Sequence, residues 1–210
     1  MQGKTQAEIA KHKIEEMFVF GELDTKTLYS ENKIANILNL GRTPVREALQ
    51  YFERVGMLTV HPKKGIEFQA VTSQHQLQII EARRQIEPTC IVLALERSTA
   101  TQKKRMLELG DEIIKSADEK SKINSLYSLQ EIHSILCEAT HNPYLSHALT
   151  PLHFSSRAFW FHTPVVDDDF QYLKIYKNFL DSLVVGNLED SLKYYGLKID
   201  ALGKFTFRLL

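Results

Sequence analysis

The sequence predicts a mostly α-helical protein in two parts. These are an N-terminal winged helix-turn-helix with a two-stranded wing, over residues 1–72, and a C-terminal antiparallel all-α bundle of about six helices, over residues 73–210. Apolar residues recur at helical spacing along most of the chain, and one short segment near residues 57–71 alternates as strands do. Beyond the boundary Val71-Thr72-Ser73-Gln74 no further alternation follows, which favours helices alone.

Composition and charge are those of an ordinary globular protein. The chain has 210 residues, of which 43% are hydrophobic and 25% charged, and its formal net charge is zero. The net charge is +1 over residues 1–72 and −1 over residues 73–210, so any affinity for DNA must come from locally placed cations. We find no apolar run of membrane-spanning length and no signal peptide, and Cys90 and Cys137 are far apart. We therefore expect a cytoplasmic protein with reduced thiols and no membrane partner.

Three helices are expected in the first part. Ala10, Ile14 and Phe18 lie on one face of the first helix, and Gly21 ends it. Ser30 is expected to cap a second helix over residues 31–38, which a tight turn follows. Thr43-Pro44 predicts the start of the third helix, with threonine as N-cap and proline at the first helical position.

The third helix and the segment after it carry the candidate DNA contacts. Arg42 and Arg46 lie at the leading end of this helix, and arginine suits both guanine edges and phosphates. Strands are expected at 57–60 and 66–71, joined by a turn that contains Lys63 and Lys64. This order of parts is typical of a winged helix-turn-helix, in which the wing reaches the DNA backbone. The two lysines taken alone could equally form a solvated turn.

This first part resembles the GntR family of bacterial transcription regulators. The segments that carry the resemblance are Leu28-Tyr29-Ser30-Glu31, Gly41-Arg42-Thr43-Pro44-Val45-Arg46-Glu47-Ala48-Leu49, Gly56-Met57-Leu58 and Gly65. The resemblance implies DNA contacts by the residues Arg42, Thr43, Arg46 and Gly65. Two positions depart from the family pattern, because Asn32 stands where an arginine is common and Gly41 where serine or threonine is common. The predicted DNA-binding set is Asn32, Arg42, Thr43, Arg46, Lys63, Lys64 and Gly65.

Six helices are expected in the second part. Their predicted ranges are 74–98, 100–119, 122–140, 143–163, 169–185 and 188–208, with kinks at Pro88 and Pro151. This part resembles the helical effector domain of the FadR-like branch of the family, called FCD. The segments that carry the resemblance are Arg83-Arg84-Gln85-Ile86-Glu87, Ile132-His133-Ser134-Ile135-Leu136, Thr140-His141-Asn142-Pro143-Tyr144-Leu145 and Gly186-Asn187-Leu188-Glu189-Asp190. The resemblance implies a homodimer formed through the helical part.

Many members of that branch bind a divalent metal through one aspartate and three histidines. By spacing, these four positions fall on Leu129, His133, Tyr176 and Lys198, so only His133 keeps a typical ligand. His153 and His162 are nine residues apart and are expected on opposite faces of their helix, so they do not replace the missing ligands. We therefore predict no metal and no other cofactor.

The replacements suggest a different ligand. Lys198 could supply the charge of the lost ion, and the predicted effector-binding set of Arg83, His133, Asn142, Tyr176 and Lys198 would suit a small organic anion. The alternative is that His133 and Tyr176 are ordinary core residues while Lys198 extends to solvent.

The sequence therefore predicts a DNA-binding transcription regulator, with repression as the favoured mode of action and activation as the alternative that the sequence leaves open. It is expected to bind a double-stranded operator as a homodimer. We predict no enzyme, because the chain has no phosphate loop, nucleophile elbow or paired metal motif. One alternative is a regulator with a degenerate effector site that a protein partner controls. The other is a ligand-binding or interaction module that keeps the winged-helix shape without binding DNA.

Overall fold

The computed structural model describes residues 5–118, 121–163 and 168–210, with the side chains of 117–118 and 168–170 excepted. The chain divides into two compact units, Met1–Val71 and Thr72–Leu210. Each unit is described by itself. None of the helices in the described ranges is long and apolar enough to cross a membrane.

The first unit is a winged helix-turn-helix. Its elements, in chain order, are α1 (Gln6–Val19), β1 (Leu28–Tyr29), α2 (Glu31–Leu38), α3 (Arg42–Arg54), β2 (Leu58–His61) and β3 (Gly65–Phe68). Helix α1 has a capping box, in which the Thr5 side chain accepts from the amide of Glu8 and the Glu8 carboxylate accepts from the amide of Thr5. As expected, Ser30 caps α2, because its hydroxyl accepts from the amide of Lys33.

The predicted start of α3 was wrong by two residues. The helix begins at Arg42 and its N-cap is Gly41, which makes no side-chain cap, so Thr43 lies inside the first turn. Proline is tolerated throughout the first turn, where amides have no partner within the helix, and Pro44 therefore does not fix the exact start. The hydroxyl of Thr43 is left exposed rather than used as a cap.

The sheet has a third strand that the sequence did not reveal. The strand order is β1-β3-β2, all antiparallel, with Tyr29 opposite Ile66 and Val60 opposite Ile66 on the other side. Strand β1 has two residues, too few to show any alternation. The prediction of a two-stranded wing holds for the hairpin β2–β3, and β1 joins this hairpin to the helices before it.

The core of the first unit lies between the sheet and the three helices. The Phe68 ring packs against Phe18, with centroids 6.0 Å apart, and edge-on against Tyr29 at 5.9 Å. Helix α3 contributes its inner face, with Val45, Leu49 and Phe52 at most 3% exposed. Burial of this face leaves the other face of α3, with its arginines, on the surface.

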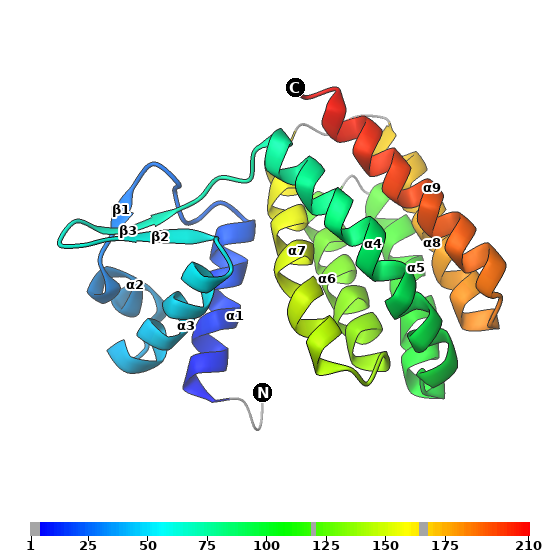
Figure 1. Cartoon of the computed structure of the whole chain (residues 1–210), viewed down its shortest axis with the longest axis horizontal. Helices are drawn as coiled ribbons and strands as arrows, with labels where there is room; N and C mark the ends of the chain where they lie inside the picture. The colour runs from blue at the N-terminus through cyan, green and yellow to red at the C-terminus, as the bar shows by residue number, and fades with distance from the viewer. Residues whose placement is uncertain (1–4, 119–120, 164–167) are drawn as a thin grey trace. The chain divides into compact units, whose positions relative to one another are not determined.

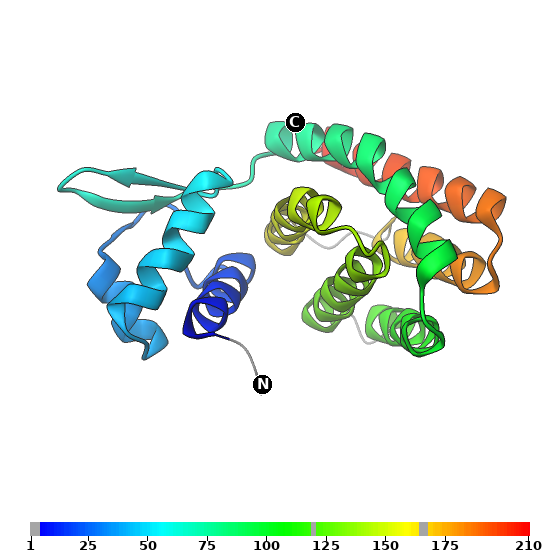
Figure 2. The ribbon, with the colours of Figure 1, turned by 60° about the horizontal axis from the view of Figure 1, so that its bottom comes forward.

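The second unit is a bundle of six helices in the described part of the chain. These are α4 (Ser73–Arg97), α5 (Ala100–Asp118), α6 (Lys122–Ala139), α7 (Pro143–His162), α8 (Asp168–Val185) and α9 (Leu188–Phe207). Their strongest contacts follow the ring α4, α7, α6, α5, α8, α9 and back to α4, as Figures 1 and 2 show from two directions. Side chains that point into this ring from different helices therefore meet in its interior. Helix α4 continues through Pro88, and α7 through Pro151.

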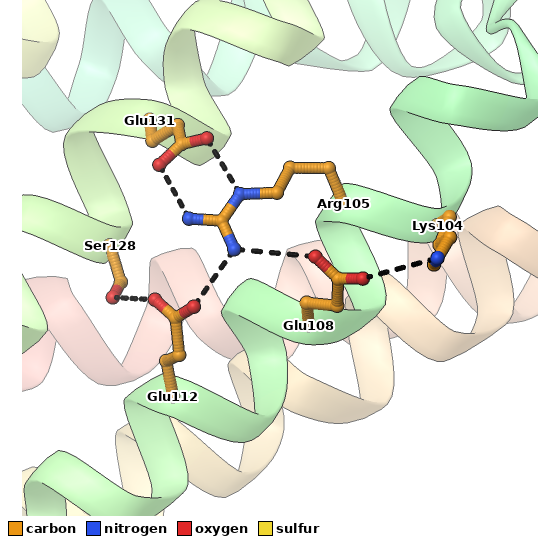
Figure 3. A network of polar contacts seen from close by, with 6 residues as sticks. All are labelled: Lys104, Arg105, Glu108, Glu112, Ser128 and Glu131. Atoms are coloured by element: carbon orange, nitrogen blue, oxygen red, sulfur yellow. Dashed lines mark hydrogen bonds and ion pairs between the residues drawn. The ribbon is translucent and has the colours of Figure 1, made fainter.

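A network of ion pairs joins α5 to α6 on the surface of the bundle (Figure 3). The guanidinium of Arg105 donates from Nε and Nη2 to the two carboxylate oxygens of Glu131, at 2.7 and 2.8 Å. Its Nη1 donates to Glu112 at 2.8 Å, and Glu112 in turn accepts from the hydroxyl of Ser128 at 3.2 Å. Arg105 and Glu112 of α5 thus contact Glu131 and Ser128 of α6, and these contacts join the two helices.

Candidate nucleic-acid interface and buried polar cluster

The residues predicted to contact DNA occupy the outer surface of the first unit. Asn32 lies in the first turn of α2, Arg42 and Thr43 begin α3, and all three side chains are exposed. Lys63 and Lys64 are exposed in the wing turn between β2 and β3. In Figures 1 and 2, α2 and the wing turn both lie on the side of this unit away from α1.

Arg46 is held by an acidic side chain from the neighbouring helix. Its Nε donates to both carboxylate oxygens of Glu31, at 3.2 and 3.1 Å, and its Nη2 donates to Oε2 at 2.9 Å. The two side chains stay on the surface, with 53% of Arg46 and 33% of Glu31 exposed. The pairing raises the pKa of Arg46 above its usual value, mainly through the hydrogen bonds to Glu31.

The wing turn is a β-turn over residues 61–64 that has a lysine, and not a glycine, at the position of positive φ. The amide of Lys64 donates to the carbonyl of His61 at 3.0 Å, Pro62 occupies the second position of the turn, and Lys63 has a φ of +62°. Gly65 begins β3 with a φ of +131°, and a Cβ there would lie 2.7 Å from the carbonyl oxygen of Tyr29. Glycine is therefore required at this position by the close approach of β1, whether or not it touches DNA.

The second candidate site is a cluster of buried polar side chains inside the helical ring. Five of the six helices contribute to it, and its main members are Arg83 and Glu87 of α4, His133 of α6, His153 and Ser156 of α7, Tyr176 of α8, and Tyr195 and Lys198 of α9. Such a group in the middle of a bundle is costly to bury unless its members are paired. The contacts show which of them are.

Glu87 is the centre of the cluster. Its Oε1 accepts from Nε of Arg83 at 2.7 Å and from Nε2 of His153 at 2.6 Å, while its Oε2 lies 3.7 Å from Nζ of Lys198. Burial raises the pKa of this carboxyl, but Arg83, Lys198 and His153 together outweigh burial and leave its pKa well below the usual value. Glu87 is therefore a buried carboxylate that faces two cations.

Two histidines lie face to face beside this carboxylate. The rings of His133 and His153 are stacked, with centroids 3.8 Å apart and planes at 17°. Burial lowers the pKa of His153 to about 4 in spite of Glu87, and burial lowers the pKa of His133 well below its usual value. Both rings are therefore neutral near pH 7, and His153 donates its Nε2 proton to the ionised carboxylate of Glu87 in a charge-assisted hydrogen bond.

Lys198 is fully enclosed, with 2% of its side chain exposed. Its ammonium group lies 4.5 Å from the ring centroid of Tyr176, 4.9 Å from that of Phe179 and 5.0 Å from that of Tyr195. Burial lowers its pKa to about 8 despite the attraction of Glu87. The alternative in which Lys198 extends to solvent is therefore not what the structure contains.

Three polar atoms near the lysine have no hydrogen-bond partner among the described residues. They are both ring nitrogens of His133 and the hydroxyl of Tyr176. A cavity of about 20 Å³ lies in this cluster, lined in part by Glu87, His133 and Lys198. A buried polar atom without a partner carries a free-energy penalty that a bound water or ligand can remove, and about 10–15 Å³ is enough for one water.

The cavity also has a less polar wall, formed by the two thiols. Cys90 and Cys137 line it, and both are buried. Burial raises the pKa of Cys90 to about 11 and that of Cys137 to about 12, so both are protonated near pH 7. They are inert packing residues here, in line with the expectation of reduced thiols.

A larger and separate cleft lies at another place in the bundle. Its volume is about 190 Å³, and its walls come from α7, α8 and α9. The side chains that line it include Trp160, Tyr172, Phe205, Lys204 and Arg208. None of the residues in the predicted effector-binding set lines this cleft.

The structure brings four of the five predicted effector residues together. Arg83, His133, Tyr176 and Lys198 are all in the buried cluster, but Asn142 instead caps α7, where its Oδ1 accepts from the amides of Tyr144 and Leu145. No described hydrogen bond joins Asn142 to the cluster. Its place in a segment that resembles the FCD domain reflects a helix cap rather than a place beside the other four side chains.

Sequence reasoning missed four members of the cluster, which are Glu87, His153, Ser156 and Tyr195. Glu87 is four residues after Arg83, the spacing at which opposite charges pair on a helix, and this signal was available. His153 was compared only with His162, which is exposed. The buried stripe of α7 includes Leu149, His153, Ser156 and Trp160, so helical periodicity would have placed His153 inside.

The side chains at the four metal-ligand positions do not fit a metal ion. Leu129 has no donor atom, Tyr176 has a pKa raised well above its usual value by burial, and Lys198 places an ammonium group inside the cluster. Glu87, which could serve as a ligand, is engaged by Arg83. Among the residues that the structure describes, no three His, Cys, Asp or Glu side chains are gathered as a metal site requires.

Comparison with known proteins agrees with both halves of this description. The family model described as bacterial regulatory proteins, gntR family, matches residues 6–68, and the FCD domain model matches residues 78–190. A curated relative is the HTH-type transcriptional regulator YdhC of Bacillus subtilis (strain 168), which is 23% identical over 141 residues. This alignment covers 66% of the present chain and 62% of the relative's length.

Solved structures show the same fold along nearly the whole chain. McbR/YncC of E. coli has a TM-score of 0.84 at 15% identity, and the comparison covers 98% of each chain. A GntR transcriptional regulator from Rhodococcus sp. RHA1 has a TM-score of 0.72 at 16% identity, over 99% of this chain and 100% of that one. These identities are low, so the structures support the fold and not a shared ligand.

The two family models cover the winged helix-turn-helix and the helical bundle, in the order that the sequence suggested. This confirms the predicted resemblance and fold class. Proteins of this kind regulate transcription and are not enzymes. The chain belongs to the GntR family of bacterial regulatory proteins, in the branch whose second domain is an FCD domain.

Proposed function

We propose that this protein is a cytoplasmic transcriptional repressor that binds an operator as a homodimer and releases it when a small organic anion enters the helical domain. One winged helix-turn-helix reads few base pairs, so two copies on a pseudo-palindromic site are expected. The observation that supports DNA binding is the exposure of Arg42 and Arg46 at the leading end of α3 and of Lys63 and Lys64 in the wing turn.

The observation that supports an anionic effector is the charge of the buried cluster. Arg83 and Lys198 are both cationic near pH 7, and Glu87 neutralises one of these two charges, which leaves one positive charge in excess. The unpartnered hydroxyl of Tyr176 and ring nitrogens of His133 lie in the same cluster. A carboxylate would balance the charge and accept hydrogen bonds from such donors.

The size of the cavity suggests how the effector acts. A space of about 20 Å³ holds a water but not an organic acid, so binding requires side chains of the cluster to move. Arg83 and Glu87 belong to α4, which begins at Ser73, directly after the junction with the first unit. A shift of α4 is therefore the proposed route by which the effector changes operator affinity, as a shift between two populations.

We also propose that the site works without a metal. The charge that an ion would bring is supplied by Lys198, and the leucine at position 129 removes one ligand altogether. Prolonged dialysis against a chelator should therefore leave the melting temperature and DNA affinity unchanged, whereas a clear loss of either would contradict this part of the proposal.

DNA binding is tested by selecting sequences from a random duplex library with the full chain. We expect an inverted-repeat sequence to be enriched, bound by a dimer and weakened by added salt. Arg46→Ala should abolish the preference for that sequence. If no sequence is enriched at low salt, the protein is a ligand-binding or interaction module rather than a DNA reader.

The effector is tested by measuring the melting temperature with a panel of small carboxylates, among them acetate, lactate, succinate and benzoate, against chloride at equal ionic strength. We expect at least one to raise the melting temperature and to release the selected duplex, and Lys198→Met to lose both effects. Lys204→Met is the matched control, because it removes a cation from the other cleft. If no carboxylate binds, or if Lys198→Met responds as the wild type does, the anion proposal fails and control by a protein partner becomes the better reading.

A further inference from the structure

We infer that Glu31 is a positioning residue for DNA recognition, which braces the guanidinium of Arg46 so that one edge of it faces a guanine or a phosphate. This inference rests on the proposed DNA binding. Glu31 belongs to α2, the helix before α3, which carries Arg46. It is not among the residues that the sequence predicted to touch DNA.

The geometry of the pair leaves one edge of the guanidinium free. Glu31 takes the Nε and Nη2 protons on the side edge of the group, through three hydrogen bonds of 2.9 to 3.2 Å. A guanidinium has five N–H donors in a planar fork, so its end edge, with Nη1 and the second proton of Nη2, remains available. Two donors on one edge are what bidentate contact with O6 and N7 of guanine requires.

Glu31 is itself fixed to the fold. It is the first residue of α2, directly after the capping residue Ser30, whose hydroxyl accepts from the amide of Lys33. Its carboxylate lies at the helix N-terminus, where the helix dipole stabilises negative charge. The contact between Glu31 and Arg46 therefore links the first turn of α2 to the second turn of α3, across the tight turn that joins these two helices.

The contact with Glu31 should favour DNA binding because it reduces the conformational entropy that the Arg46 side chain loses on binding and fixes the orientation of its guanidinium group. Arg46 is on the surface, with 53% of its side chain exposed, and an unbraced arginine there loses rotamer freedom when it binds a base. Because Glu31 already holds the side chain in one orientation, part of this loss occurs on folding rather than on binding. The opposite effect of Glu31, repulsion of the DNA phosphates, acts equally on every sequence.

These two effects have opposite signs, so one variant separates them. Glu31→Gln removes the charge and weakens the brace, and we expect about a tenfold loss of affinity for the selected duplex. Affinity for an unrelated duplex should stay the same or rise, because a negative charge has been removed. Discrimination at the base pair read by Arg46, identified from Arg46→Gln, should fall together with it.

A double-mutant cycle and a control of equal charge complete the test. If Glu31 acts through Arg46, Glu31→Gln should have no further effect on base preference in the Arg46→Gln background. Glu53→Gln, which removes an exposed carboxylate at the other end of α3, should leave base preference intact. Melting temperatures of all variants should match that of the wild type, since both side chains of the pair are on the surface.

Three results would overturn the inference. Tighter binding of Glu31→Gln to the selected duplex would mean that Glu31 masks Arg46 rather than bracing it. Unchanged affinity and base preference would mean that the pair is a surface contact without a role in recognition. A wild type that enriches no sequence at all would remove the proposed DNA binding and this inference with it, whereas the first two results leave DNA binding intact.

Discussion

Glu87 and Lys198 face each other across the centre of the bundle, yet their removal should have unequal effects. Glu87→Gln would leave Arg83 and Lys198 buried without a counter-charge, and we expect it to lower the free energy of unfolding of the bundle by about 3–5 kcal/mol. Lys198→Met should be close to neutral at pH 7, since Glu87 keeps Arg83 and His153 as partners.

Urea unfolding followed by the fluorescence of Trp160 measures both changes, because Trp160 is the chain's single tryptophan and is buried in α7. A cost for Lys198→Met as large as that for Glu87→Gln would show that the lysine, and not the carboxylate, organises the cluster.

The glycine that directly follows the wing turn should be intolerant of any side chain. Gly65→Ala would place a Cβ 2.7 Å from the carbonyl oxygen of Tyr29 in a backbone of positive φ, and we expect a loss of about 1–3 kcal/mol from the first unit. Gly41→Ala is the matched control, because its Cβ would meet nothing nearer than 3.6 Å. Scanning calorimetry should show a lower transition temperature for Gly65→Ala than for the wild type, and an unchanged transition temperature for Gly41→Ala.

At this scale the sequence was informative where a motif fixed the residue type and less so where side chains meet by packing. Arg83, His133, Tyr176 and Lys198 were predicted as a set and do lie together in the cluster. Asn142 was predicted by its neighbours in the chain, but a cap residue is needed before Pro143 for local reasons. The stacking of His133 on His153 depends on how α6 and α7 pack, which no spacing within one helix specifies.

At the scale of helices, the histidine pair makes the packing of α4, α6 and α7 sensitive to acid. The pKa of His153 is about 4 in the folded chain and near 6.5 when unfolded, so the unfolded state binds more protons between these values. Stability should therefore fall as pH decreases from about 6.5 to 4, by up to about 1.4 kcal/mol per pH unit for each such histidine. Glu87 adds a further loss only below its ordinary pKa, since its folded pKa is lower still.

The midpoint of urea unfolding at pH 7, 6 and 5, again followed through Trp160, tests this. His153→Gln should flatten the dependence, because it removes one of the two groups that must take up a proton. An unchanged slope in that variant would assign the acid sensitivity to other groups.

The Arg105 network should matter modestly for the pairing of α5 with α6. Arg105→Ala removes a bidentate pair with Glu131, but the arginine is 35% exposed and its partners more so, and we expect a loss of about 1 kcal/mol or less. The loss should shrink in 1 M salt, where exposed charges are screened. A loss that salt does not change would point to packing of the aliphatic stem instead.

The sequence predicted helices better than it predicted strands or helix starts. All six bundle helices begin and end within one residue of their expected bounds, because long amphipathic periodicity and flanking caps mark them strongly. Strand β1 was missed, since a two-residue strand has no periodicity of its own and exists through its pairing with β3. The start of α3 was placed two residues too late because proline fits anywhere in a first turn.

At the scale of the whole molecule, the absence of net charge on the chain limits how DNA can be bound. The candidate cations are Arg42, Arg46, Lys63 and Lys64 in each copy. If a dimer uses them all, the logarithm of the binding constant should fall with the logarithm of salt concentration with a slope of about −7 or shallower. Filter binding on the selected duplex measures this slope. A much steeper dependence would show that cations outside this surface take part.

Lys63→Ala and Lys64→Ala separate phosphate contact from a merely solvated turn. Each should reduce the magnitude of the slope by about 2 in a dimer and weaken all sequences alike, because phosphate contacts carry no base preference. An unchanged slope in both variants would mean that α3, and not the wing, makes the main contacts with DNA.

The enclosed, protonated state of Cys90 and Cys137 has a practical consequence for following this molecule in motion. With both thiols buried and their pKa values near 11 and 12, the wild-type chain offers almost no background to maleimide or spin-label reagents at neutral pH. A single Lys64→Cys substitution would therefore place one label at the tip of the wing in each copy of the proposed homodimer. Pulsed electron resonance would measure the distance between the two labels with and without a carboxylate. This distance would report directly on the spacing of the two winged helix-turn-helix units.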